Sequence, residues 1–294
     1  MGWSVAGLVF GFLLGFYLVS FRPGTAPVSV QFVGSSEFEV WRTILAASVG
    51  IWIGSIPLQL RWLKRASKIA GTDARGFWAA AAVLLMVLGI VILVTWMTRG
   101  DNALPLDYAN PRLLVIQLVG IGASGIAAIG LLIVGNGARA YPNSWTSPTD
   151  VNVHRVLSFR TFNRRFLALL GGFVGLSVLA TGALRNAELA AGIEFPSENV
   201  ILYGAFFTAL VAAIYVPAFA AVEKLAGRIL DTAFPIPTIG DGDQTPIDAV
   251  ERLRHRDVYG NALQVGGTAK GNLEGVLMVL TPVLTALFAS ALGG

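Results

Sequence analysis

The chain has 294 residues, of which 55% are hydrophobic and 13% are charged, and its mean hydropathy is +0.69. Soluble globular domains carry about 25% charged residues, so this composition indicates an all-α protein embedded in a membrane. The absence of cysteine excludes disulfides and thiolate metal sites.

The apolar residues fall into seven long blocks. A membrane-spanning helix needs about 20 apolar residues, and each block is about that long. The sequence therefore predicts a polytopic transmembrane bundle over 1–222, a cytoplasmic segment over 223–274, and a last span or re-entrant segment over 275–294. The blocks in the bundle are 3–21, 40–60, 77–97, 113–134, 166–184 and 200–222.

The first two blocks carry small residues four apart. Gly7, Gly11 and Gly15 lie in the first block, which we interpret as a retained span because no Lys or Arg precedes it. Gly50 and Gly54 lie in the second block. Small residues at this spacing let two membrane helices approach closely. The pattern predicts helix packing, either within one chain or between two copies.

The fourth block contains Gly120, Gly122 and Gly125 in the spacing of a dinucleotide-binding turn. That turn needs a strand before it, a helix after it and a later acidic residue. Here the three glycines lie inside a continuous apolar block, so we interpret them as part of a membrane helix.

The fifth block is preceded by basic residues and contains another glycine pair. Arg160, Arg164 and Arg165 are predicted to reach lipid headgroups, either as topology signals or as an anionic-lipid site. Three arginines fall short of the four to eight basic residues typical of such a site. Gly171 and Gly175 predict a further close helix contact.

Prolines interrupt the last two blocks. Pro217 and Pro282 each remove a backbone donor and are expected to kink their helices. With the hydroxyls of Thr281 and Thr285, these kinks are candidates for a pore or gate. The alternative interpretation is ordinary hydrogen bonding between packed helices.

The hydrophilic segment 223–274 contains one short predicted helix. Thr245 is suited to the N-cap, Pro246 to the first helical position and Gly260 to the end. Ile247, Val250 and Leu253 share one face, so the helix over 246–259 is expected to be amphipathic. It is predicted to lie on the bundle or headgroups, or to dock a partner.

The basic residues alternate with the spans. Sixteen of the 21 lysines and arginines lie in 61–76, 135–165 and 223–274, which alternate with segments that hold only five. Cytoplasmic loops carry an excess of Lys and Arg, so the N-terminus is predicted to be cytoplasmic. The arginine-rich, Ala- and Gly-rich composition favours a bacterial inner (plasma) membrane protein.

Ionisable residues avoid the centres of the predicted spans, so no catalytic, cofactor or metal residues are predicted. We expect a non-enzymatic subunit or scaffold of a membrane complex that self-associates, with the lipid bilayer, other copies or complex subunits as partners and no nucleic acid. The alternatives are a channel, pore-forming effector or uncharged-solute transporter, and then a membrane enzyme acting on lipid.

Overall fold

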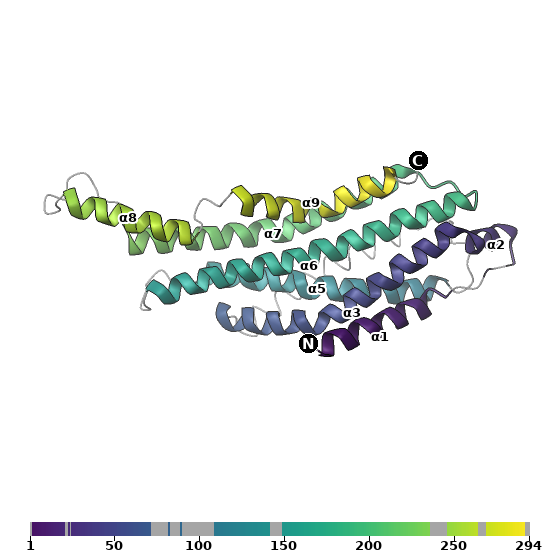
Figure 1. The fold of residues 1–294 in the computed structure, drawn as a ribbon, viewed down its shortest axis with the longest axis horizontal. Coiled ribbons are helices and arrows are strands. Elements are labelled where there is room, and N and C mark those ends of the chain that lie inside the picture. The colour runs from purple at the N-terminus through teal and green to yellow at the C-terminus, as the bar shows by residue number, and fades with distance from the viewer. Residues whose placement is uncertain are drawn as a thin grey trace.

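The computed structural model describes residues 2–20, 23, 25–71, 82, 89, 109–141, 149–235, 246–263 and 269–291. Within these ranges the chain is almost entirely helical, so the predicted helical class is confirmed (Figure 1). The helices are α1 (Gly2–Leu18), α2 (Pro27–Gly34), α3 (Ser36–Ala70), α5 (Ala109–Ala140), α6 (Thr149–Ala190), α7 (Ser197–Ala233), α8 (Pro246–Ala262) and α9 (Ala269–Ala291).

Five of these helices are long and apolar enough to cross a membrane, namely α3, α5, α6, α7 and α9. The part of α1 whose side chains the structure describes, Val5–Leu18, is a shorter apolar helix than these five. The third predicted block, 77–97, lies outside the described residues except at positions 82 and 89. Seven spans and a cytoplasmic N-terminus therefore stay predictions.

The boundaries of α3 follow from local chemistry. The Ser35 hydroxyl accepts a hydrogen bond from the backbone amide of Phe38 at 3.1 Å, which caps the first turn. Glu37 and Glu39 lie in that turn, where negative charge favours the helix dipole. Gly71 ends the helix with a φ of 61°, a left-handed conformation that suits glycine.

The long helices run up and down, so that three basic segments meet at one end of the bundle. Ala70 of α3 lies against Gly137 of α5, and Arg228 of α7 donates to the carbonyl oxygens of Ala138 and Tyr141, both at 3.5 Å. We call the end formed by residues 61–70, 135–141, 149–165 and 223–233 the basic end. The opposite end is marked by the hydrogen bond from Arg112 to the Ser20 carbonyl oxygen, 2.8 Å.

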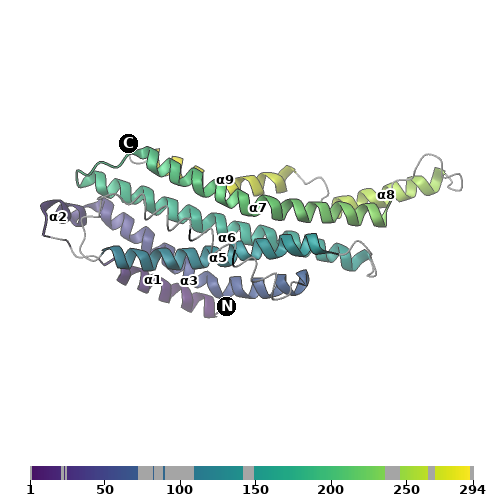
Figure 2. The same ribbon diagram turned by 180° about the vertical axis from the view of Figure 1, so that it is seen from behind.

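Four helices are longer than the hydrocarbon core of a bilayer requires. At 1.5 Å per residue, the 35, 32, 42 and 37 residues of α3, α5, α6 and α7 extend over about 52, 48, 63 and 55 Å. The hydrocarbon core of a bilayer is about 30 Å thick. The shorter α1 and α9 begin inside the bundle, short of the basic end, and run towards the opposite end (Figures 1 and 2). The basic end thus continues past the part of the bundle that α1 and α9 cover.

Helix α8 projects at the basic end (Figure 1). Arg256 holds it to the end of α7 through Asp231 and the Phe234 carbonyl oxygen, each at 2.6 Å, and the rings of Tyr259 and Phe234 stack at 4.8 Å. The helix passes through Gly260, which packs on Leu230, and ends later than the predicted 246–259.

The α8 face that contacts α7 differs from the predicted apolar face. Val250 and Leu253 are 66% and 44% exposed, while the contacts come from Arg256, Tyr259 and Gly260. An ion pair and a ring stack therefore position this helix on the bundle.

Candidate functional site

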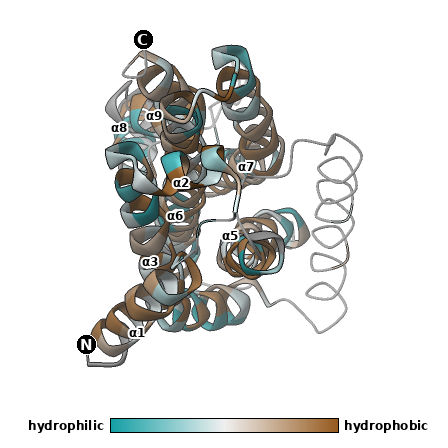
Figure 3. Cartoon of the chain, turned by 90° about the vertical axis from the view of Figure 1, so that its right-hand side faces the viewer, coloured by the Kyte–Doolittle hydropathy of each residue, from teal (hydrophilic) through white to brown (hydrophobic). Residues whose placement is uncertain are grey.

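The glycine row of α1 faces the small residues of α3. Gly7 lies against Gly54, Gly11 against Gly50, and Gly15 against Ala46, so the two helices are antiparallel along this row. End-on, α1 lies at the edge of the bundle beside α3 (Figure 3). The predicted packing residues of the first two blocks therefore meet each other within one chain.

The glycine pair of α6 faces α9. Gly171 lies against the carbonyl oxygen of Met278, and Gly175 against the side chains of Thr281 and Thr285. The hydroxyl of Thr281 donates to the Leu277 carbonyl oxygen at 3.0 Å, and that of Thr285 donates to the Thr281 carbonyl oxygen at 2.7 Å. Both hydroxyl protons are therefore directed along α9 itself, and a gate at these residues stays a prediction.

Pro282 lies inside the continuous helix α9, and α7 contacts this part of the helix. Proline leaves its helix without one donor and disturbs the hydrogen bonds around it. The next amide, that of Val283, donates to the hydroxyl oxygen of Thr208 at 3.1 Å. Gly204, one turn earlier on α7, allows close approach to the Pro282 carbonyl oxygen and to Ala286. Two α7 residues thus position the part of α9 around Pro282.

Pro217 of α7 contacts α5. Its carbonyl oxygen accepts a hydrogen bond from Arg139 at 3.1 Å, and the adjacent Ala218 packs on Gly135. This segment is thereby anchored by a neighbouring helix. The pore or gate role of Pro217 stays a prediction.

The three arginines before the fifth block have different surroundings. Arg160 forms a 2.6 Å ion pair with Glu223 of α7, and their side chains are only 13% and 25% exposed. The guanidinium of Arg165 lies 5.1 Å from the centre of the Trp62 ring on α3, while Arg164 is exposed. Arg160 therefore links α6 to α7, and the predicted lipid-headgroup role stays open to test at all three residues.

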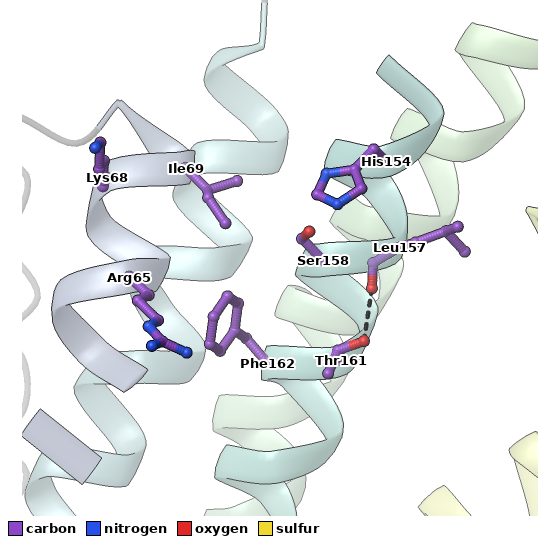
Figure 4. Close-up of a pocket in the computed structure, with 8 residues that line it drawn as sticks. All are labelled: Arg65, Lys68, Ile69, His154, Leu157, Ser158, Thr161 and Phe162. Atoms are coloured by element: carbon purple, nitrogen blue, oxygen red, sulfur yellow. Dashed lines mark hydrogen bonds between the residues drawn. The ribbon is translucent and has the colours of Figure 1, made fainter. Parts of the chain in front are cut away.

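A pocket of about 400 Å³ lies between α3 and α6 at the basic end (Figure 4). Arg65 and Ile69 extend from α3 towards α6, and His154 and Ser158 extend from α6 towards α3. The ring of Phe162 lies near Arg65. The full lining of the pocket is Arg65, Lys68, Ile69, His154, Leu157, Ser158, Thr161 and Phe162.

This pocket is not predictable from either segment alone, because its lining comes from two segments far apart in the chain. Arg65 and His154 are almost 90 positions apart, and only the antiparallel packing of α3 on α6 brings them together. The sequence does indicate that the two segments lie on the same side of the membrane, because both carry the excess of Lys and Arg that is typical of cytoplasmic loops.

Two buried side-chain amides were also missed. Gln59 is fully buried and donates to the Ser55 hydroxyl at 2.9 Å, and Asn163 is 3% exposed. Among the described residues, the amide oxygens of Gln59 and Asn163 have no hydrogen-bond partner. Such an atom costs about 1–3 kcal/mol when buried, so both amides are unusual features of the interior.

No family model matches the chain, and neither the curated proteins nor the solved structures include a match. In the part of the chain that the structure describes, no group of three His, Asp or Glu side chains is arranged to hold a metal ion. The five long apolar helices are compatible with an integral membrane protein that crosses the bilayer several times.

Proposed function

We propose that the protein is a non-enzymatic subunit or scaffold of a membrane complex in a bacterial inner membrane. The observation that carries this proposal is the extension of α3, α6 and α7 beyond the length that a bilayer needs. A helical bundle that continues past the membrane presents a rigid surface on which other subunits can assemble.

The buried core of the bundle continues into the extension. Val156 and Phe159 of α6 are fully buried together with Leu225 of α7 and Ala66 of α3. Arg61, Lys64 and Arg165 are exposed around this core. A buried apolar interior with a charged exterior is typical of a helical region in water, which supports a platform outside the bilayer.

Self-association belongs to this proposal, but two glycine rows are already occupied within one chain. The row on α1 faces α3, and the row on α6 faces α9. We therefore place contacts between copies on surfaces outside these two rows.

The first test is functional reconstitution. Purified full-length protein in liposomes should give no ion flux above that of protein-free liposomes. Reproducible single-channel currents would refute the scaffold and favour the channel alternative. In lipid nanodiscs, the particle should contain more than one 31.1 kDa chain; a single chain would refute self-association.

The second test addresses the platform directly. A photo-crosslinking amino acid at Lys64, exposed at the basic end, should capture protein in cells. The same probe at Leu202, exposed on the apolar part of α7, serves as the control. Protein adducts at Leu202 but none at Lys64 would contradict a platform at the basic end.

A further inference from the structure

The pocket at the basic end combines positive charge with an apolar wall. Arg65 and Lys68 come from α3, and His154 comes from α6. Ile69, Leu157 and Phe162 supply the apolar part of the lining. A ligand that suits both parts carries a negative group and a hydrocarbon portion.

The two pocket cations have no acidic partner among the described residues. The ion pairs of the described chain use Arg42, Arg160 and Arg256. No described carboxylate lies within 4.0 Å of Arg65, Lys68 or His154. These charges are therefore available to an anion that enters the pocket.

The hydroxyl groups of the pocket differ in what they can donate. Thr161 donates its proton to the Leu157 carbonyl oxygen at 2.8 Å (Figure 4). Ser158 makes no hydrogen bond to any residue that the structure describes, and its side chain faces α3. Ser158 can therefore donate to a bound oxygen while Thr161 stays bonded to its own helix.

The pocket lies next to residues typical of the membrane–water boundary. Trp62 is one turn from Arg65 on α3, and it contacts both the Arg165 guanidinium and the Phe166 ring. Tryptophan is enriched at the level of the lipid headgroups, and arginine reaches the headgroups from nearby positions. The pocket is thus within one or two helical turns of the level at which lipid phosphates lie.

We propose that this pocket binds the phosphate group of an anionic membrane lipid. The Arg65 guanidinium, the Lys68 ammonium, the Ser158 hydroxyl and a His154 ring N–H supply donors for the phosphate oxygens. Phe162, the apolar lining residue nearest the membrane, covers the adjoining hydrocarbon. The site differs from the arginine cluster expected at 160–165, because both of its cations lie on α3 and α6 adds only the Ser158 hydroxyl and the His154 ring.

Native mass spectrometry of the full-length protein in detergent can test this site with dioleoylphosphatidylglycerol, against dioleoylphosphatidylcholine as the zwitterionic control. We expect the anionic lipid to bind more tightly. Replacing both cations, in the Arg65→Gln/Lys68→Gln variant, should weaken its binding about tenfold or more. Ser158→Ala should weaken it by a smaller factor and provides a second variant if the double variant fails to fold.

The matched control is Arg61→Gln/Lys64→Gln, which removes the same charge from the same helix outside the pocket. It should change binding by no more than about twofold. Equal losses in the two double variants would overturn the proposal, because they would indicate diffuse attraction to the whole basic end. Equal binding of the two lipids would also overturn it. Binding of inorganic phosphate without binding of the anionic lipid would overturn the lipid assignment.

Discussion

The contact between α1 and α3 allows a graded prediction from two substitutions of the same kind. A Cβ atom on Gly15 would lie 2.8 Å from the Ala46 carbonyl oxygen and 2.9 Å from the Ala46 Cα. On Gly7 the nearest atom would be the Gly54 Cα at 3.4 Å, an ordinary contact. Gly15→Ala should therefore push the helices apart, whereas Gly7→Ala should fit.

The size of the difference follows from the atoms involved. At Gly15 the two nearest obstructing atoms belong to the backbone of Ala46, so α1 must shift by about 0.5 Å or more to restore contact distances. A gap of about 0.5–1 Å removes about a quarter to a half of the attractive energy of each van der Waals contact along the row. Overpacking of this kind costs about 1–3 kcal/mol. Gly7→Ala should leave the free energy of unfolding nearly unchanged or raise it, because alanine favours a helix by up to about 1 kcal/mol over glycine.

The assay is the free energy of unfolding of each variant in a detergent or bicelle system in which unfolding is reversible. The oligomeric state is measured in parallel. Equal effects of the two substitutions, or a neutral Gly15→Ala, would refute the close packing of α1 on α3. A Gly15→Ala protein that keeps its stability but dissociates would instead assign the row to contacts between copies.

Three further predictions concern contacts between helices. Thr208→Val removes the acceptor of the Val283 amide and should destabilise the protein by about 1–2 kcal/mol. The control is Thr43→Val, because the Thr43 hydroxyl is exposed and bonded within its own helix. It should have a smaller effect in the same unfolding assay. A double-mutant cycle with Arg160→Gln and Glu223→Gln should give a coupling of about 1–3 kcal/mol, and additive losses would contradict a direct pair. Arg256→Gln should raise hydrogen exchange in α8 and leave α6 and α7 protected; unchanged exchange in α8 would show that other contacts hold it.

Much of the helical architecture was predictable from sequence, because apolar blocks of spanning length are a local property. The structure describes five such helices, and they include the second, fourth, fifth, sixth and seventh predicted blocks. Their ends were less predictable. Helix α3 continues ten residues past the predicted 40–60, because the residues of this extension pack against other helices instead of lipid.

The candidate sites were less predictable than the helices. The glycine spacing indicates that a face can pack closely, but it does not identify the partner helix. Pro282 was expected to kink its helix, yet the role of Thr208 as the acceptor for the following amide depends on the packing of α7 on α9. Gln59 and Asn163 were overlooked because an uncharged amide hardly alters the hydropathy of a block.

The amino-acid sequence by itself determined the helical class, the long apolar segments and the distribution of basic residues, because each depends on composition over one or two dozen neighbouring positions. Only the tertiary structure decided that Gly15 faces Ala46, that Arg160 pairs with Glu223, and that Arg65 and His154 line one pocket. These contacts join segments about 30 to 90 residues apart. Their partners are selected by the fit of whole helix surfaces, which no single segment specifies.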